Sequence, residues 1–509
     1  MIQIVAFVLL VLMGLWMAVE IGSGGVAGPA AVGGGIVLLA LIGIFGRKRP
    51  IELVALVAGS VGFMICGKGF AYLRLGQVFF MGEMILAFVA LFYIVRVYTG
   101  RFSLLPGSRM TLPLFLLLAY SGIHALYDYN TYGLMAFRDA CIAYYAIVFF
   151  AAYQLGREPA AVEFTARVFV WAAPVVLMVA VINSFFPSLM RQFQNLTVRG
   201  VPLLIPHEAV TNACLGMVCA LIIRARQVSF WSLVGLMFAI VSLGYLIVSA
   251  RGAAMMSIFC CAAWLILARQ WKVITIGVPI AIVAVIVMVP ILSAYHAGSE
   301  SDLWRKIAEQ VDALNPFTFG SQKSVDAATG QWRVFWWKMI WNDTLDHAPL
   351  FGEGFGKDIY SDFHRAFFRT PYVSEDAART RGAHNAFFTF IARGGLIAGL
   401  FFAWVIVVQV GYFWRAAGAL RRGELPWHSL YLWGFLIVGF VVTFVQYTWE
   451  ASYIAIPFWT CCGLAFAELD RIEEARDAEE SSLRPAAAQA RGEVVRGFGG
   501  TRGERPALA

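Results

Sequence analysis

Apolar runs of about 16–25 residues recur along almost the whole chain, separated by short polar breaks. A helix of this length crosses the hydrocarbon core of a bilayer, where helices and closed barrels alone satisfy their own backbone polar groups. Hydrophobic residues make up 60% of the 509 residues and charged residues 14%, whereas a soluble domain averages about 45–50% apolar and about a quarter charged. A water-soluble core could not hide so much apolar surface. The sequence therefore predicts an all-α, polytopic transmembrane helix bundle.

The positions of the runs predict about fourteen spans. The first run, from Ile2 to Val19, lacks the basic start and the small-residue cleavage site of a signal peptide, so we interpret it as a retained span. The expected spans lie near residues 2–19, 28–45, 51–66, 77–96, 110–126, 140–155, 164–186, 207–223, 230–248, 252–268, 273–293, 384–413, 428–446 and 451–467.

Lysine and arginine are distributed unequally between alternate loops, and the richer loops are expected to face the cytoplasm. Both termini are therefore predicted to be cytoplasmic. The even-numbered connections hold about 15 cations, namely Arg47, Lys48, Arg49, Arg96, Arg101, Arg109, Arg157, Arg167, Arg224, Arg226, Arg269, Lys272, Arg415, Arg421 and Arg422. The odd-numbered connections hold about 6, namely Lys68, Arg74, Arg138, Arg191, Arg199 and Arg251.

This topology divides the chain into four parts. Residues 1–293 form spans one to eleven, residues 294–383 a large helical extracytoplasmic loop, residues 384–467 the last three spans and residues 468–509 a cytoplasmic tail. The tail is expected to form a short helix that fades into disorder. The net charge of +8 comes from cations scattered through loops, which argues against a nucleic-acid partner.

The eight cysteines lie in or beside apolar runs, which indicates small buried hydrophobic residues and not disulfides or metal ligands. No Cys/His grouping has the spacing of a zinc site, so we expect no metal and no cofactor. The cysteines are Cys66, Cys141, Cys214, Cys219, Cys260, Cys261, Cys461 and Cys462.

Two arginines on the predicted outer side are candidate functional residues. Arg251 opens a span, and an arginine near the apolar core commonly faces a water-filled cavity or an anionic group, although it could also snorkel to lipid headgroups. Arg333 lies in the external loop, within a stretch from Gln331 to Leu345 that has apolar residues at helical spacing. We expect an amphipathic helix there, at the membrane surface that tryptophan favours.

A glycine-rich turn follows that helix, with Gly352, Gly354 and Gly356 at alternate positions. Successive backbone N–H groups in such a turn can bind phosphate oxygens, and the alternative is an ordinary loop. The turn is neither a P-loop nor a dinucleotide fingerprint, because no Lys-Ser/Thr follows it and no strand precedes it.

His384 and Asn385 lie where the external loop re-enters the membrane, just before a run with Gly394, Gly395 and Gly399. A histidine at an apolar–polar boundary can act as an uncharged base near neutral pH, or it can simply pack or cap a helix. Asn385 could cap the helix or orient the imidazole. His207 and Glu208 form a similar pair at another outer boundary.

Together these residues resemble the O-antigen ligase and polymerase family of bacterial envelope enzymes. The resemblance rests on Ser249-Ala250-Arg251-Gly252 at the start of a span, on Arg333 with Trp336 and Trp337, on Pro349 to Gly356, and on His384-Asn385 with the glycines that follow. Their order matches the family, as does the large external loop, over roughly residues 230–445. The sequence departs from the family at Ala250, where a serine is common, at Glu353 in the glycine-rich turn, and in about two additional amino-terminal spans.

The resemblance implies an inverting, metal-independent glycosyl transfer at the outer face of the bacterial inner membrane. The donor would be a glycan on undecaprenyl pyrophosphate, and the acceptor a sugar hydroxyl of lipid A core or of another lipid-linked repeat. Arg251 and Arg333 would bind the pyrophosphate and His384 would act as the base. Arginines in a low-dielectric pocket stabilise a phosphate leaving group without metal. The external Arg191 and Arg199 are further candidates for phosphate contact.

Five functions stay open at this point, and two of them are oligosaccharide transfer to protein, a further reaction of the same class, and a purely structural scaffold. A glycan ligase is the leading hypothesis, and a repeat-unit polymerase for O-antigen or exopolysaccharide shares the same motifs. A multi-span transporter is the alternative from another class. Hydropathy shows no inverted repeat, and most spans lack a charged residue near the middle, Glu83 and Asp139 excepted. These features disfavour the transporter.

Overall fold

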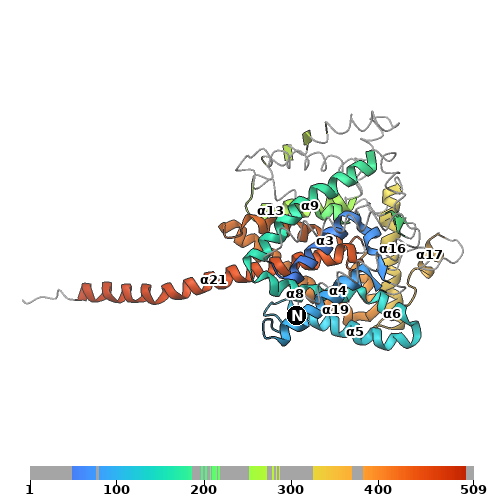
Figure 1. Ribbon diagram of the computed structural model, residues 1–509, viewed down its shortest axis with the longest axis horizontal. Helices are drawn as coiled ribbons and strands as arrows, with labels where there is room; N and C mark the ends of the chain where they lie inside the picture. The colour runs from blue at the N-terminus through green and yellow to red at the C-terminus, as the bar shows by residue number, and fades with distance from the viewer. Residues whose placement is uncertain are drawn as a thin grey trace, which may run out of the picture.

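A computed structural model gives the three-dimensional structure of the chain (Figure 1). It describes residues 49–75, 79–185, 197–198, 201–202, 207, 209–214, 216–217, 252–271, 325–368, 382–446 and 448–499, with isolated residues between 275 and 286. The two predicted amino-terminal spans, near 2–19 and 28–45, lie outside these ranges.

The described residues are almost entirely helical. The helices of the first half are α3 (Ile51–Ala71), α4 (Met81–Tyr98), α5 (Thr111–Tyr132), α6 (Leu134–Asp139), α7 (Cys141–Tyr144), α8 (Ile147–Gly156), α9 (Pro159–Phe185) and α13 (Gly252–Leu267). Those of the second half are α16 (Val325–His347), α17 (Ser361–Phe368), α19 (Ala386–Arg422), α20 (Trp427–Val442) and α21 (Ser452–Gly499).

Strands are confined to two very short antiparallel hairpins within the described ranges. In the first, β1 (Arg74–Leu75) pairs with β2 (Phe79–Phe80), and in the second, β3 (Thr197–Val198) pairs with β4 (Val201–Pro202). Val198 is the partner of Val201, so β3 and β4 flank the pair 199–200, which lies outside the description. The all-α prediction is confirmed for the described part of the chain apart from these hairpins.

Six helical segments are long and apolar enough to cross a membrane, which confirms a multi-pass membrane protein. They are Ile51–Ala71, Met81–Tyr98, Leu134–Gly156, Pro159–Ala180, Ala386–Arg422 and Ser452–Ser482. All six overlap predicted spans. The total of about fourteen, and the side of the membrane that each end faces, stay predictions, because several of the expected spans fall outside the described residues.

One tight crossing, between α8 and α21, holds α21 in the bundle. A Cβ atom added to Gly463 of α21 would lie 2.6 Å from Tyr153 N and 2.7 Å from Phe149 O of α8. A Cβ atom added to Gly156 would lie 2.8 Å from Leu464 Cα. Small residues let helix backbones approach closely in membranes, where van der Waals packing drives association.

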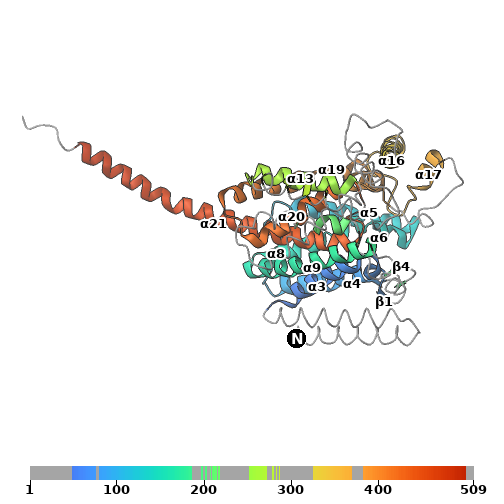
Figure 2. The same ribbon diagram turned by 90° about the horizontal axis from the view of Figure 1, so that it is seen from above.

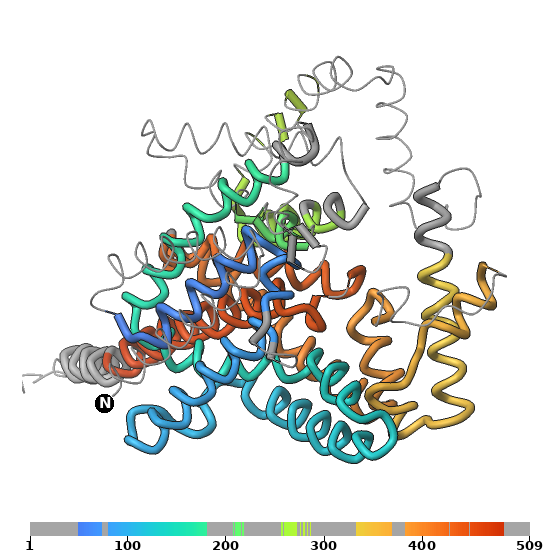
Figure 3. Tube along the Cα trace, turned by 45° about the vertical axis from the view of Figure 1, so that its right-hand side comes forward, coloured from blue at the N-terminus to red at the C-terminus, as the bar shows by residue number. Residues whose placement is uncertain are grey.

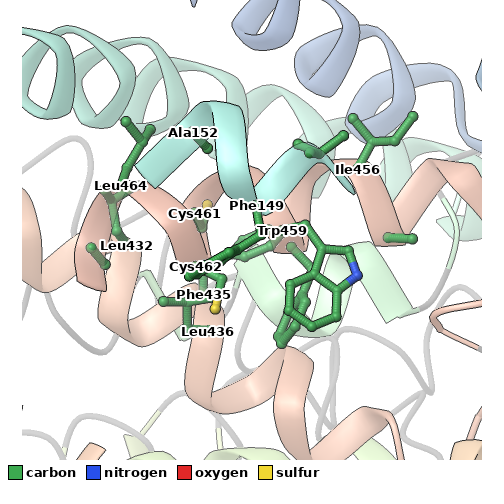
Figure 4. Packing of buried hydrophobic residues seen from close by; sticks show 14 of the residues in the cluster. Phe149, Ala152, Leu432, Phe435, Leu436, Ile456, Trp459, Cys461, Cys462 and Leu464 are labelled. Carbon is green, nitrogen blue, oxygen red and sulfur yellow. The ribbon is translucent and has the colours of Figure 1, made fainter. Parts of the chain in front are cut away.

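Side chains from α8, α20 and α21 interlock around this crossing (Figure 4). Trp459, Cys461 and Cys462 are buried there among Phe149 and Phe435. The seven cysteines in the described ranges are free, and four of them are fully buried. This agrees with their prediction as small hydrophobic residues.

The helices of the bundle run side by side, and the two ends of the bundle differ (Figures 2 and 3). Helices α16 and α17 lie at one end, with α16 seen end-on in Figure 2, so its axis runs across the bundle. The carboxyl-terminal part of α21 projects from the opposite end. The predicted helix from Gln331 to Leu345 is therefore present within α16, at one end of the spans. Its apolar residues do not gather on one face, since Ile340 is buried whereas Trp341 and Leu345 are exposed, so the amphipathic character expected from the sequence is not present.

Helix α21 continues beyond the bundle to Gly499, whereas the sequence predicts that the tail forms only a short helix before it fades into disorder. Its continuation is rich in Ala, Glu and Arg, which favour helices. Arg476 and Glu480 form an i,i+4 ion pair on it, with Nε and Oε1 3.8 Å apart. Composition alone underestimated the length of this helix.

We expect Gly463→Val to lower the thermal unfolding midpoint of the protein in detergent or nanodiscs. The two added methyl groups would press into the backbone of α8, and overpacking of this kind costs about 1–3 kcal/mol. Gly411→Val in α19 is the matched control, because a Cβ atom there meets nothing within 4 Å. Equal midpoints for the two variants would contradict the tight crossing of α8 and α21.

Candidate active site

Helix α16 is held by an aromatic cluster at one end of the bundle. Trp336 is 1% exposed and stacks on Phe363 of α17, with ring centroids 4.8 Å apart at an angle of 15°. Its Nε1 donates a hydrogen bond to Ile359 O at 2.9 Å, so the indole N–H is satisfied within the protein. The tryptophans that are frequent in this part of the sequence therefore pack into a small hydrophobic core against α16.

Trp337 joins α16 to the segment that carries His384. Its Nε1 donates to Ala383 O at 2.8 Å, and its ring stacks on Phe388 at 5.4 Å and 8°. Ala383 N in turn donates to Thr389 Oγ1 at 3.0 Å. Both the C=O and the N–H of Ala383, the residue before His384, are thus hydrogen-bonded.

His384 has a left-handed backbone, with φ of 54°. Among the described residues other than glycine, only Arg269 shares a positive φ. The conformation is uncommon for a residue with a Cβ atom, costs about 1–3 kcal/mol, and persists where neighbouring contacts impose it, often at active sites. Here those contacts are the bonds to Ala383 and a bond from Ala386 N to Thr443 O at 3.1 Å.

Asn385 caps helix α19. Its Oδ1 accepts from Phe387 N at 3.0 Å and from Phe388 N at 3.4 Å, and its Nδ2 donates to Phe444 O at 3.0 Å. The capping role considered from the sequence is therefore the one present, with both ends of the amide engaged inside the protein. Substrate contact through Asn385 stays a prediction.

The imidazole of His384 is surrounded by aromatic rings and cations. It lies edge-to-face with Trp332, at 5.5 Å between ring centroids and 83°, and 6.3 Å from Trp336. The Arg333 guanidinium lies 5.4 Å above the ring of Trp332. Burial, followed by the charges of Arg333 and Lys68, lowers the pKa of His384 from its usual 6.5 to about 3.

This arrangement keeps His384 neutral across the physiological pH range, because both the burial and the neighbouring cations disfavour the imidazolium form. A neutral imidazole can accept a proton from a hydroxyl group within hydrogen-bond reach. The same cations would attract an anionic group bound beside it. The structure therefore brings together Arg333 and His384, two residues that the sequence singled out.

Lys68 belongs to this cluster and was not among the candidate site residues. It lies in the last turn of α3, directly after Gly67, whose φ of 50° interrupts the helix. The sequence offered one signal, since Lys68 is a cation on a predicted outer loop. Because Lys68 lies far from His384 in the sequence, its proximity to the imidazole could not be predicted.

Glu450 also approaches this segment. A Cβ atom added to Gly382 would lie 1.8 Å from Glu450 Oε2, so the carboxylate packs directly on the glycine two residues before His384. The main chain of Glu450 accepts a bond from Cys141 Sγ at 3.0 Å. Sequence reasoning missed Glu450, because it lies in a short polar break between two spans.

Three predicted arginines, Arg251, Arg191 and Arg199, lie outside the described residues. Helix α13 starts at Gly252, and Trp264 near its other end donates from Nε1 to Phe413 O at 2.8 Å. Phe413 lies toward the carboxyl end of α19. Gly252 therefore lies toward the end of the bundle that holds His384, while contacts of Arg251 itself stay a prediction.

The glycine-rich turn docks on the protein through its own N–H groups. Five successive N–H groups donate to protein oxygens: Gly352 to Ala348 O at 2.8 Å, Glu353 to Ala392 O at 2.8 Å, Gly354 to Arg393 O at 3.1 Å, Phe355 to Asp128 Oδ2 at 2.6 Å and Gly356 to Asp139 Oδ2 at 3.0 Å.

This docking argues against the prediction that the turn binds phosphate, because the N–H groups of Gly352, Gly354 and Gly356 already donate hydrogen bonds to protein oxygens. The turn meets α19 at Arg393, which at 1.5 Å per residue is about 12 Å along the helix from Asn385. The turn therefore contacts α19 well away from His384, which precedes this helix.

A buried charge pair fixes the turn to α6. Arg393 is 0% exposed, and its Nη2 lies 3.0 Å from Asp139 Oδ2. Its Nη1 donates to Lys357 O. On the neighbouring helix α5, His124 Nδ1 lies 2.7 Å from Asp128 Oδ2. Asp139 was noted in the sequence as a charge inside a span, and its partner in the second half of the chain accounts for it.

The other boundary histidine has a local role. Ala209 N donates to His207 Nδ1 at 3.2 Å, and the imidazole packs on Tyr453 with centroids 4.5 Å apart. Glu208 lies outside the described residues.

We expect Arg393→Met and Asp139→Asn each to destabilise the protein by about 3–5 kcal/mol, because each leaves a buried charge without its opposite partner. Asp362→Asn is the matched control, since Asp362 and Arg365 form an ion pair of the same residue types at 2.8 Å on the exposed surface of α17. Thermal unfolding in nanodiscs provides the comparison. Equal midpoints for all three variants would contradict the structural role of the buried pair.

The comparison with known families gives one match. A family model described as O-antigen ligase matches residues 236–403. That stretch contains Arg251, Arg333, the glycine-rich turn and His384, whereas Lys68 and Asp139 lie outside it. No curated protein matches the chain.

Proposed function

We propose that this chain, which belongs to the O-antigen ligase and polymerase family through residues 236–403, is a glycan ligase of the inner membrane. It transfers a glycan from undecaprenyl pyrophosphate to a sugar hydroxyl of lipid A core at the periplasmic face. The coarser assignment, a multi-pass membrane enzyme of the O-antigen ligase kind, rests on the family match and on the six candidate spans.

One observation carries the proposal: a neutral histidine with a left-handed backbone lies beside two cations at the end of a membrane helix bundle. With the donor bound, the negative charge of its pyrophosphate offsets the charges of Arg333 and Lys68 and raises the pKa of His384. The imidazole then becomes a stronger base and removes the proton from the acceptor hydroxyl. The acceptor oxygen then forms a bond to the anomeric carbon of the donor sugar.

The bond from that carbon to the pyrophosphate oxygen breaks on the opposite side, which inverts the anomeric configuration. Negative charge grows on the leaving pyrophosphate during this step. Arg333 and Lys68 stabilise that charge in a partly desolvated site, a role that needs no metal ion. Arg251, which directly precedes α13 in the sequence, is the third proposed phosphate ligand. The polyprenyl tail of the donor stays in the bilayer, which explains why the site lies on a bundle of spans.

Complementation of a deletion strain tests this function. Strains that carry His384→Ala, Arg333→Ala or Lys68→Ala should lose capped lipopolysaccharide and accumulate full-length lipid-linked glycan. Lys338→Ala is the matched control for Arg333→Ala, because Lys338 is exposed on the same helix. Membrane levels of each variant separate lost chemistry from misfolding.

The glycan pattern distinguishes the alternatives. If the mutant strains carry single repeats in place of long chains, the enzyme is a polymerase and not a ligase. Glycans unchanged by the deletion itself would contradict glycosyl transfer and favour the transporter.

The pH dependence of kcat/KM provides a second test, since this quantity reports the ionisation of the free enzyme. With the pKa of His384 at about 3, the histidine stays deprotonated down to mildly acidic pH. We therefore expect no loss of activity near its ordinary pKa of about 6.5. Arg333→Gln removes a neighbouring cation, so the pKa of His384 should rise and activity should fall at a higher pH than in the wild type. Lys338→Gln should not shift the profile. An acidic limb near 6.5 in the wild type would contradict the neutral base.

A further inference from the structure

The tip of the glycine-rich turn exposes two large apolar side chains. Leu350 is 55% exposed and Phe351 is 58% exposed, and the preceding Pro349 is exposed as well. The N–H groups of the following residues all bind the protein, so the turn is fixed while its apolar tip points outward. Exposed apolar side chains that lie together on a surface commonly mark a site of contact with another protein or with a membrane.

The backbone of the tip is bonded to the start of the straight part of α19. Leu396 N donates to Pro349 O at 2.9 Å, and Ile397 N donates to Leu350 O at 3.4 Å. Gly395, with φ of 66°, interrupts the helix here, and a Cβ atom at this position would lie 2.3 Å from Leu350 O. The tip is therefore at the level of Leu396 along the span.

That level coincides with one boundary of the hydrocarbon core. The stretch from Leu396 to Trp414 is apolar and, at 1.5 Å per residue, about 28 Å long. This is close to the thickness of the core, about 30 Å. Charges mark its two ends: Arg393 pairs with Asp139 at one, and Arg415 pairs with Asp470 at 2.6 Å at the other.

The tip also continues an exposed apolar surface. On α19 the exposed large residues recur every three or four positions, so they form one face of the helix: Leu400, Trp404, Val407, Val410 and Trp414. On α5, which the turn contacts through Asp128, the exposed residues near the same end are Ile123, Leu126 and Tyr127. Surfaces of this kind on spans face lipid.

We propose that Leu350 and Phe351 insert into the lipid bilayer at the boundary between headgroups and acyl chains, on the side where α16 lies. The glycine-rich turn is then a membrane anchor for the external loop. The ion pair of Glu353 and Lys357, with Oε2 and Nζ 3.7 Å apart, lies just beyond the tip on the headgroup side. The inference goes beyond the proposed reaction and requires only that α19 spans the membrane.

Fluorescence quenching by lipids tests the position of the tip. The full chain with Phe351→Cys is labelled with an environment-sensitive fluorophore and placed in nanodiscs of phosphatidylethanolamine and phosphatidylglycerol. Some of these lipids carry a nitroxide high on the acyl chain. Phe368→Cys is the matched control, an exposed phenylalanine on α17, which lies beyond α16 from the bundle (Figure 2). The parent chain, labelled in parallel, corrects for its own eight cysteines.

We expect the label at 351 to emit at shorter wavelength and to be quenched at least twofold by the nitroxide lipid, and the label at 368 to be quenched little. Aqueous iodide should give the opposite order. Equal quenching at both positions, or stronger iodide quenching at 351, would overturn the proposal. Leu350→Cys provides a second position if Phe351→Cys expresses poorly. The measurement needs no substrate, so its outcome is independent of whether the chain is a ligase.

Discussion

The hydrogen bond from Trp337 Nε1 to Ala383 O, at 2.8 Å, joins α16 to the turn that carries His384. Because it holds the residue before the histidine, it helps to impose the left-handed backbone that a histidine seldom adopts. The same helix presents Arg333 to the imidazole. Helix α16 thus supplies both a cation beside the imidazole and a hydrogen bond that supports the turn. The bond from Ala386 N to Thr443 O closes the other side of the turn.

Charge placement explains how this turn is positioned relative to the bilayer. A buried pair, Arg393 with Asp139, lies at one end of the apolar stretch of α19, and Arg415 with Asp470 lies at the other. Charged groups are costly within hydrocarbon, so such pairs favour a single depth of the helix. Tyr153 and Tyr412 both donate to Asp470 at 2.7 Å, which satisfies that carboxylate at its end of the bundle.

Hydropathy was sufficient to predict the helical class and the positions of the described spans, because an apolar run in lipid has no alternative to a helix. His384 was identified by its place where the loop re-enters the membrane and Arg333 as a cation in the external loop, and the family resemblance gave both residues their predicted roles. The left-handed φ of His384 could not be predicted, since partners far away in the sequence impose it. The glycine spacing correctly indicated a turn, but it could not identify the side chains that accept hydrogen bonds from the N–H groups of that turn. Asp128 and Asp139 lie on helices more than two hundred positions earlier in the chain.

The family-matched stretch, residues 236–403, does not build the site by itself. Lys68 of α3 contributes charge beside the imidazole, Thr443 and Phe444 after α20 hold Asn385 and Ala386, and Glu450 packs on Gly382. These groups come from helices on both sides of the matched stretch in the sequence. The arrangement around His384 therefore depends on the surrounding bundle as well as on the motifs. A change in α3 or in the loop after α20 therefore alters the surroundings of the His384 imidazole as directly as a change within the motifs.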